Sequence, residues 1–303
     1  MLYDVIVIGG GPAGYTCALY AARANLNVLV LEKLAPGGQM ATTDRVDNYP
    51  GFPDGVEGFE LAMSMKKGAE RFGAVSQMAD VTEVKLQGDI KEICAGGKQL
   101  QARTVVLASG ARPRELGLPG EKELRGRGVS YCATCDGMFY RGKTVVVVGG
   151  GDTACADALY LSRLCQKVLV VHRRDKLRAS AAYQKPLLEA GNVEFIWDSE
   201  VTALEYADIL TGAHLRNKKT GAQTLIACSG LFVAIGQVPE TGLFAGQIDL
   251  DPAGYVLAGE DTRTNLPGVF CAGDLRAKPL RQIVTACADG AVAAQAAEEY
   301  LSM

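Results

Sequence analysis

What this sequence lacks argues against several classes of protein. It has no apolar run of about 18 residues, which a membrane-spanning helix would need, so we expect no membrane association. Acidic and basic residues are interspersed, and the net charge of −3 gives no basic surface for nucleic acid. Histidine occurs only twice, and His172 has no second histidine or carboxylate at ligand spacing, so we expect no metal site. Met1 leads almost directly into an apolar segment, so we expect no signal peptide.

The nine cysteines are odd in number and mostly solitary, which is typical of a reducing cytosol. We therefore expect a cytoplasmic protein. Most of the cysteines lie in apolar helix or strand patterns, where a free thiol packs like a small hydrophobic side chain. We expect the following seven to be buried and inert: Cys17, Cys94, Cys155, Cys165, Cys228, Cys271 and Cys287.

One pattern occurs twice in the chain: an apolar segment, a glycine-rich turn, a helical segment and a second apolar segment. The first copy spans residues 4–32 and the second spans residues 144–174, with equivalent positions 140 residues apart (149 − 9 and 172 − 32). A strand–turn–helix–strand unit of this kind binds a dinucleotide. The 303 residues, 48% of them hydrophobic, are enough for two domains, so the repeat predicts two nucleotide sites.

Outside the two copies the sequence predicts further regular elements. Residues 35–60 read as a long ordered loop, residues 61–72 as a helix, and residues 74–107 as short strands. Buried strands are also expected at residues 105–108, 231–235 and 269–272, and an alanine-rich helix at about 282–301.

The glycines of the first copy are Gly9, Gly11 and Gly14, which follow a strand and open a helix. The first permits a tight turn, the second lets a pyrophosphate approach the backbone, and the third lets helix and strand pack closely. The helix N-terminus adds free N–H donors. Glu32, at the end of the next strand, is placed to accept hydrogen bonds from ribose hydroxyls, although a solvated acid at a strand end is the alternative.

The second copy has Gly149, Gly151 and Ala154 at its turn, and it lacks the acid. A basic group takes the place of that acid: His172, Arg173, Arg174 and, four residues on, Arg178. Cations at this point suit a ribose 2′-phosphate, which a carboxylate would repel. The group therefore predicts NADP(H) rather than NAD(H), and a solvated basic loop is the alternative.

Cys132 and Cys135 form a Cys-X-X-Cys sequence that Asp136 follows directly. A structural zinc site would need a second ligand pair, which is absent, and a structural disulfide is unusual in the cytosol. A redox dithiol fits best, because closely spaced cysteines can lower one thiol's pKa and form a reducible pair. Asp136 could give and take protons at the sulfurs, although a turn or N-cap role beside Gly137 is a serious alternative.

The whole chain resembles the bacterial-type, low-molecular-weight thioredoxin reductases. The most specific stretches are Cys132–Asp136 and the Gly-Asp and Arg-Gln pairs near the C-terminus. The residues that carry the resemblance are Gly9–Gly14, Gly37–Gln39, Asn48–Gly51, Cys132–Gly137, Gly149–Ala154, His172–Arg174 with Arg178, and Gly273-Asp274 with Arg281–Ile283.

The resemblance implies an α/β fold with two Rossmann-like dinucleotide-binding domains, the NADPH domain being inserted in a discontinuous FAD domain. The FAD domain would comprise residues 1–114 and 245–303. The NADPH domain would comprise residues 115–244 and would carry the redox dithiol.

The resemblance also implies the residues of each cofactor site. Those expected to line FAD are Gly9, Gly11, Pro12, Ala13, Gly14, Glu32, Gly38, Gln39, Asn48, Val81, Ala108, Gly110, Gly273, Asp274, Arg281, Gln282 and Ile283. Those expected to line NADPH are Gly149, Gly151, Asp152, Thr153, Ala154, His172, Arg173, Arg174, Arg178, Ile235 and Gly236.

By the same resemblance, NADPH reduces the flavin, the flavin reduces the Cys132–Cys135 disulfide, and the dithiol reduces thioredoxin. Cys135 would lie nearest the flavin and Cys132 would attack thioredoxin, with Cys132, Cys135 and Asp136 as the catalytic residues. A homodimer is implied. Alternatives are a reductase of another small disulfide carrier, glutaredoxin-like or peroxidase-linked, a ferredoxin-type NADP reductase, or a non-catalytic NADP(H)-sensing flavoprotein. The Cys-X-X-Cys sequence counts against the ferredoxin-type enzyme.

Overall fold

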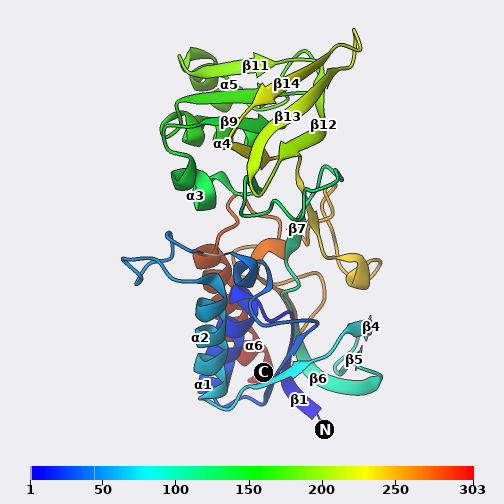
Figure 1. Ribbon diagram of the computed structural model, residues 1–303. Coiled ribbons are helices and arrows are strands. Elements are labelled where there is room, and N and C mark those ends of the chain that lie inside the picture. The colour runs from blue at the N-terminus through cyan, green and yellow to red at the C-terminus, as the bar shows by residue number, and fades with distance from the viewer. Residues whose placement is uncertain (1, 44) are drawn as a thin grey trace. The chain divides into compact units, whose positions relative to one another are not determined.

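The structure is a computed structural model that describes residues 2–43 and 45–303 (Figure 1). Its contacts divide the chain into a discontinuous unit, Met1–Arg112 with Val238–Met303, and an inserted unit, Pro113–Gln237. The expected boundaries lie after residues 114 and 244, which is two residues and seven residues beyond the divisions in the structure. The chain passes between the units through β7 (Ala111–Pro113) and β16 (Gln237–Pro239), which pair with each other.

The discontinuous unit is built on one mixed sheet. Strands β1, β2, β3, β6 and β17 are parallel, and β4 and β5 join antiparallel at one edge. The central strands β1 and β2 are almost wholly apolar because both faces of the sheet are covered. Along the sheet the order is β3 (Val75–Met78), β2 (Val28–Glu32), β1 (Leu2–Ile8), β6 (Lys98–Leu107), β5 (Lys91–Ala95) and β4 (Val81–Lys85), with β17 (Val269–Cys271) also on β6.

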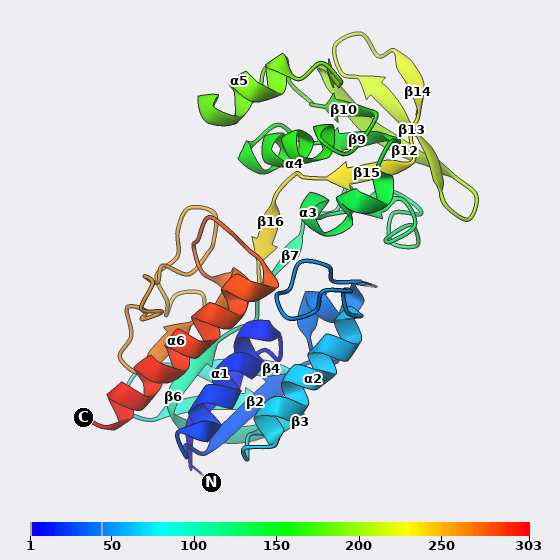
Figure 2. The ribbon, with the colours of Figure 1, turned by 90° about the vertical axis from the view of Figure 1, so that its left-hand side faces the viewer.

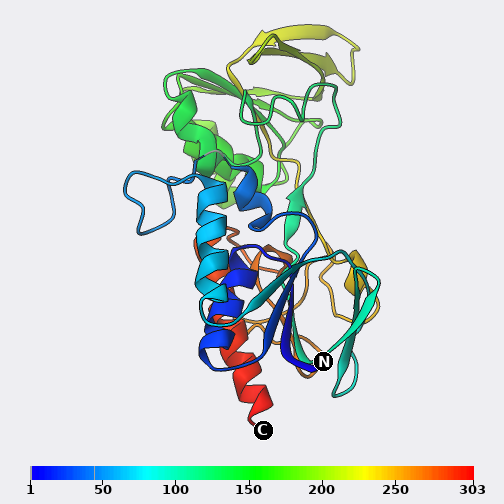
Figure 3. The ribbon, with the colours of Figure 1, turned by 60° about the horizontal axis from the view of Figure 1, so that its bottom comes forward.

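Three helices, α1 (Pro12–Arg23), α2 (Gly58–Glu70) and α6 (Ile283–Leu301), lie together on one face of this sheet (Figure 2). Helices α1 and α6 approach closely, since a Cβ on Gly290 would lie only 2.2 Å from Ala13 O. The start of β1 and the end of α6 lie at the same end of the unit (Figure 3). Short 3-10 turns occur at η1 (Gly38–Thr42), η3 (Gly242–Phe244) and η4 (Gly273–Leu275).

The inserted unit repeats the same design around a parallel sheet. Its order is β11 (Val193–Ile196), β10 (Lys167–Val171), β9 (Thr144–Val148), β15 (Gly230–Val233) and β8 (Val129–Ser130). Helices α4 (Asp152–Ser162) and α5 (Ala181–Glu189) pack with one face of it. The other face packs against an antiparallel sheet of β12 (Ser199–Tyr206), β13 (Leu210–Asn217) and β14 (Gln223–Ala227). The remaining elements are α3 (Ala133–Asp136) and η2 (Gly137–Tyr140).

The predicted fold class is confirmed: each unit holds the strand–turn–helix–strand repeat, as β1–α1–β2 and as β9–α4–β10. The helix expected at residues 61–72 begins three residues earlier, at Gly58, and ends at Glu70. Glycine is required at position 58, since a Cβ there would lie only 2.0 Å from Met40 O. The helix expected at about 282–301 is α6, which begins one residue later because Gln282 caps it through Thr285.

Candidate active site

The turn of the first copy is fixed by glycines. Gly9 has φ +113°, and a Cβ on it would lie 2.3 Å from Ala108 O, at the end of β6. A Cβ on Gly14 would lie 1.9 Å from Gly9 O, so only glycine lets α1 begin this close to the turn. The backbone of β1 therefore turns tightly into a helix whose first N–H groups remain available to an anion.

The space above this turn is open. A Cβ on Gly11 would meet nothing closer than Gly37 O at 4.0 Å, and Gly38 lies against Gly11 at a comparable distance. Pro12 and Ala13 start the helix next to them. This opening fits the pyrophosphate of a dinucleotide, which needs close backbone approach without side chains.

Glu32 is already engaged by the backbone. Its Oε2 accepts the Gly10 N–H (2.7 Å) and its Oε1 accepts the Leu34 N–H (3.3 Å). A carboxylate has further lone pairs, so these bonds orient Glu32 at the end of β2 and leave capacity for ribose hydroxyls. Val81 begins β4, three residues after Met78, which pairs with Glu32, and the Ala79 N–H between them donates to the Glu32 carbonyl oxygen (2.8 Å).

Segments distant in the sequence meet at the N-terminus of α6. Asn48 Nδ2 donates to Gln282 Oε1 (3.0 Å), which joins two predicted residues that are 234 positions apart. Ile283 follows as the first residue of the helix. Gln39 donates to the carbonyl oxygen of Ala111, just after Gly110, whose φ of +73° favours glycine.

Asp274 carries the most informative atom of this half. Its Oδ1 is buried and has no hydrogen-bond partner among the residues that the structure describes. Burial raises the pKa of Asp274. Arg281 lies beside it, with its Nε donating to the Asp274 carbonyl oxygen (3.4 Å). A buried acceptor of this kind needs a donor, and a hydroxyl of the FAD ribityl chain would supply one, so this half-site fits FAD.

Gly273 sets the position of Asp274. It has φ +78°, and a Cβ on it would lie 2.9 Å from the Ala13 Cβ, next to the first turn of α1. Its N–H donates to Asp289 Oδ2 (2.9 Å) on α6. Asp289 in turn pairs with Arg276 and Lys278, all three of them nearly inaccessible to solvent. A buried ionic cluster thus supports the Gly273–Asp274 turn.

The turn of the second copy has the same design in the inserted unit. Gly149 has φ +152°, and a Cβ on it would lie 2.4 Å from Ala234 O and 2.7 Å from the Ala154 Cβ. Gly151 has nothing within 4 Å of such a Cβ, which leaves the opening that a pyrophosphate needs. Asp152 and Thr153 begin α4, and Asp152 Oδ1 accepts the Ser180 N–H (2.6 Å).

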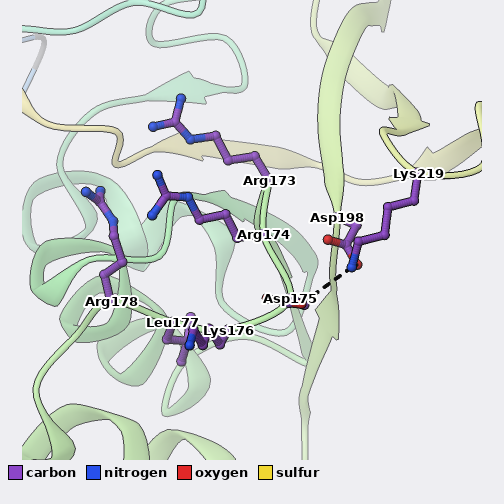
Figure 4. Close-up of a pocket in the computed structure, with 8 residues that line it drawn as sticks. All are labelled: Arg173, Arg174, Asp175, Lys176, Leu177, Arg178, Asp198 and Lys219. Atoms are coloured by element: carbon purple, nitrogen blue, oxygen red, sulfur yellow. Dashed lines mark hydrogen bonds and ion pairs between the residues drawn. The ribbon is translucent and has the colours of Figure 1, made fainter.

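A cationic cavity of about 240 Å³ lies beyond the end of β10 (Figure 4). Arg173, Arg174 and Arg178 line it, as the sequence predicts for the 2′-phosphate position. Lys219 reaches in from the β13–β14 turn and pairs with Asp198 (2.9 Å) and Asp175 (3.5 Å). The cavity is lined by Arg173, Arg174, Asp175, Lys176, Leu177, Arg178, Asp198 and Lys219.

His172 lies elsewhere, in the interior. The residue is only 4% exposed, and its ring contacts Trp197 edge to face. The ring also lies directly against Gly150, since a Cβ on Gly150 would be only 2.3 Å from His172 Nδ1. Burial, and then the charge of Arg178, lower the pKa of His172. A neutral, buried imidazole supplies no cation, so His172 shapes the Gly150 turn while the arginines face the cavity.

Ile235 and Gly236 follow β15 at the same end of the sheet as the Gly149 turn. Gly236 has φ +111°, and its carbonyl oxygen accepts the Arg114 N–H (3.0 Å). Ile235 is half-buried beside the core of the unit. Both residues therefore lie where a parallel sheet opens toward a bound nucleotide.

The dithiol is oxidised in this structure. Cys132 and Cys135 form a disulfide with their Cα atoms 5.3 Å apart, and Cys135 lies in the short helix α3. Ser130 Oγ donates to Asp136 Oδ2 (2.6 Å), so the carboxylate is held beside the disulfide. Gly137 anchors the other end, since a Cβ on it would lie 2.9 Å from the Tyr160 ring on α4.

The other cysteines divide into two groups. Cys17, Cys155, Cys165, Cys228 and Cys271 are buried free thiols, and burial raises the pKa of each of them. Cys94 and Cys287 are half-buried, and Cys287 Sγ lies 3.7 Å from Tyr49 Oη. A raised pKa keeps the five buried thiols protonated. The expectation of burial is wrong for Cys94 and Cys287, which are half-buried free thiols, and Cys132 and Cys135 form the disulfide.

Sequence reasoning missed several residues of these sites. Lys219 reaches the cationic cavity from the β13–β14 turn and Asp198 from the connection between β11 and β12, and no local pattern marks them. Ser130, two positions before Cys132, carried no motif of its own, and the support that Asp289 gives to Gly273 depends on tertiary contacts. Among residues 2–43 and 45–303, no cluster of histidine, cysteine and acidic side chains is suited to a metal ion, and no helix is long and apolar enough to span a bilayer.

Comparison with known proteins agrees with this geometry. Residues 3–290 match the model of the pyridine nucleotide-disulphide oxidoreductases. A thioredoxin reductase from Streptomyces clavuligerus is 49% identical over 302 residues, covering 99% of this chain and 94% of that protein. A bifunctional thioredoxin reductase/thioredoxin from Mycobacterium leprae is 48% identical, covering 99% of this chain and 66% of that protein.

Among solved structures, the thioredoxin reductase from Streptococcus pyogenes is similar to the chain with a TM-score of 0.92 and 44% identity, covering 99% of this chain and 98% of that one. Enzymes of this kind use FAD and NADPH, which are the two cofactors of this chain. The chain belongs to the pyridine nucleotide-disulphide oxidoreductase family.

Proposed function

We propose that this chain is an NADPH-dependent thioredoxin reductase in which Cys132 and Cys135 are the redox pair. The observation that carries the proposal is the Cys132–Cys135 disulfide in the unit that also holds the cationic cavity. Relatives and solved structures named thioredoxin reductase match the chain along nearly its whole length. A non-catalytic sensor would have no need of a reducible disulfide, and a ferredoxin-type reductase would lack one.

The two glycine turns would hold the two cofactors. The Gly9–Gly14 turn, Glu32 and Asp274 would hold FAD in the discontinuous unit. The Gly149–Ala154 turn and the arginines of the cationic cavity would hold NADPH in the inserted unit. Bound together, the cofactors would supply the two electrons that reduce the disulfide. The protein's own contribution is to orient both nucleotides and to manage protons at the dithiol.

The chemistry at the dithiol follows from the order of its residues. Two electrons break the Cys132–Cys135 bond, and one of the two resulting thiolates takes a proton from Asp136. The Cys132 thiolate then attacks one sulfur of the thioredoxin disulfide, and the other thioredoxin sulfur leaves and is protonated. Asp136 takes the proton back from Cys135 as Cys135 attacks Cys132, which re-forms the enzyme disulfide; the second thioredoxin sulfur leaves and is protonated. The two protons on thioredoxin correspond to the hydride of NADPH and one proton from solvent, so one NADPH and one proton are consumed in each cycle.

The remaining parts of the proposal concern the setting. We place the enzyme in the cytoplasm, because its many unpaired thiols, five of them buried, suit a reducing compartment. We also propose a homodimer, and thioredoxin as the protein substrate. The bifunctional relative, named as both reductase and thioredoxin, supports thioredoxin over glutaredoxin-like or peroxidase-linked carriers.

The test is NADPH-dependent reduction of thioredoxin, followed by insulin reduction. We expect the wild type to turn over a thioredoxin far faster than a glutaredoxin-like or peroxidase-linked carrier. Cys132→Ser should keep reduction of the bound flavin by NADPH, seen as loss of visible absorbance without oxygen, and should lose thioredoxin turnover. Turnover at the wild-type rate by Cys132→Ser would show that the dithiol assignment is wrong.

A further inference from the structure

We infer that Ser130 is a positioning residue for the reaction, and that its hydroxyl group holds the Asp136 carboxylate in place beside the dithiol. The inference rests on the proposed function, because that function gives Asp136 its role in proton transfer. It assigns a task to a buried side chain outside the Cys-X-X-Cys-Asp sequence.

The Ser130 hydroxyl group joins the two ends of the dithiol segment. It donates to Asp136 Oδ2 (2.6 Å) and accepts the Cys132 N–H (3.1 Å). The Cys132 carbonyl oxygen is a poorer acceptor at 3.3 Å, so the single hydroxyl hydrogen goes to the carboxylate. One oxygen atom thereby links the backbone at the first cysteine to the carboxylate that follows the second.

The position of Ser130 is fixed by the core. The residue is 2% exposed and pairs in β8 with Phe232 of β15. Phe232 in turn packs edge to face with Tyr140, which ends the segment of α3 and η2. Burial and strand pairing therefore fix the position of the Ser130 hydroxyl group relative to the dithiol segment, and it acts as a positioned donor.

A fixed donor to a carboxylate stabilises the ionised form, and thereby lowers the pKa of that group. Titratable groups lie on the elements that pack around Asp136. Tyr140 stays neutral, because burial and then the Asp136 charge raise its pKa to about 12. Helix α4 packs against α3 and carries Asp152, Tyr160 and Asp157, and burial raises the pKa of Asp157 to about 7. Apart from the reduced cysteines, Asp157 is thus the group to control for.

The first experiment measures kcat/KM for thioredoxin against pH in the holoenzyme. Without the donor, Asp136 should bind its proton more tightly, so Ser130→Ala should move the profile to higher pH by about one unit. Ser130→Thr keeps a hydroxyl group and should restore the wild-type profile. Asp157→Asn, combined with Ser130→Ala, should leave the size of the shift unchanged. An unshifted profile in Ser130→Ala would overturn the inference.

A double-mutant cycle separates positioning from mere packing. If Ser130 acts through Asp136, Ser130→Ala should have no further effect in an Asp136→Asn background. An equal loss of rate in both backgrounds would mean that Ser130 only supports the fold. NADPH–ferricyanide activity, which bypasses the dithiol, should be unchanged in Ser130→Ala, Ser130→Thr and Asp157→Asn and reports an intact fold.

The inference also has a readout that needs no thioredoxin. Thiol titration after anaerobic addition of NADPH gives the rate at which the disulfide opens. The pH profile of that rate should move to higher pH in Ser130→Ala, in the same way as the pH profile of thioredoxin turnover. If the wild type opened its disulfide but left thioredoxin oxidised, the proposed function would fail, and this titration would still decide the role of Ser130.

Discussion

Tyr131 donates its phenolic hydrogen to Glu121 Oε1 at 2.7 Å, which ties the residue before Cys132 to the segment that opens the inserted unit. Glu121 is 2% exposed and also accepts the N–H groups of Leu116, Gly117 and Leu118. Burial, and then the bond to Glu121, raise the pKa of Tyr131, so the phenol remains a donor. A single carboxylate therefore organises both the entry segment and one end of the dithiol segment.

Removing this carboxylate should cost far more than removing its phenol partner. Tyr131→Phe loses one hydrogen bond, worth about 1 kcal/mol of unfolding free energy. Glu121→Ala leaves three part-buried N–H groups and one hydroxyl without their acceptor, and should cost about 2–3 kcal/mol. Thermal unfolding of the holoenzyme measures both.

The matched control is Glu123→Ala, an exposed acid two positions away, which should change stability by less than about 0.5 kcal/mol. Equal losses in Glu121→Ala and Glu123→Ala would mean that the carboxylate does not organise the segment.

Local patterns and long-range contacts explain how far the sequence could predict this structure. The repeat can be predicted from the sequence, because a buried parallel strand and a glycine turn need particular residues at fixed spacing. Gly9 and Gly149 are therefore recognisable as the first glycines of two nucleotide-binding turns. Adjacency in the sequence places His172 with Arg173, whereas in the structure the His172 ring packs against Gly150 in the interior and Arg173 lines the cavity, a difference that depends on tertiary contacts. The roles of Lys219 and Ser130 depend on which strands pair, and strand pairing cannot be predicted from a single sequence.

The arginines of the cationic cavity should make the enzyme prefer NADPH over NADH. Arg173→Ala with Arg174→Ala removes two charged donors that only the 2′-phosphate of NADPH can use. The KM for NADPH should rise by about tenfold or more, since a hydrogen bond to a charged group contributes about 1.5–3 kcal/mol, while the KM for NADH should stay nearly constant. Steady-state kinetics with each cofactor measures the ratio.

Two controls accompany this measurement. Lys219→Ala should have a smaller effect, because Lys219 is already paired with Asp198 and Asp175. Arg216→Ala removes a cation that pairs with Glu200 and does not line the cavity, so it should leave the ratio unchanged. A constant NADPH-to-NADH ratio in the double variant would contradict the role given to the arginines.

Arg276 pairs with the buried Asp289 and with the exposed Glu260, and we expect the loss of Asp289 to lower the free energy of unfolding far more. Asp289→Asn leaves Lys278 buried without its counter-charge and leaves Arg276 with only the exposed Glu260, and it should cost about 3–5 kcal/mol. Because Asp289 also holds Gly273 beside Asp274, we expect weaker retention of FAD, measured by fluorescence of released flavin. Glu260 is the other ion-pair partner of Arg276, and the Glu260 side chain is 92% exposed. Glu260→Gln should therefore cost less than about 1 kcal/mol of unfolding free energy. Similar losses in the two variants would refute the buried cluster as a support.

The half-buried carboxyl group of Asp157 predicts a pH-dependent stability. Burial raises the pKa of Asp157 to about 7, whereas the group ionises near 3.9 in an unfolded chain. Between these values the folded state binds more protons than the unfolded state, so this group makes stability fall as the pH rises from about 4 to about 7. Asp157→Asn removes that dependence.

The Tm of Asp157→Asn should equal that of the wild type near pH 4 and exceed it above pH 7, by about 2–4 °C for each kcal/mol regained. Asp208→Asn, an exposed acid between β12 and β13, should follow the wild-type curve at every pH. If Asp157→Asn instead unfolded at the wild-type temperature at both pH values, the carboxyl group would be ionising in the folded protein as freely as it does in water.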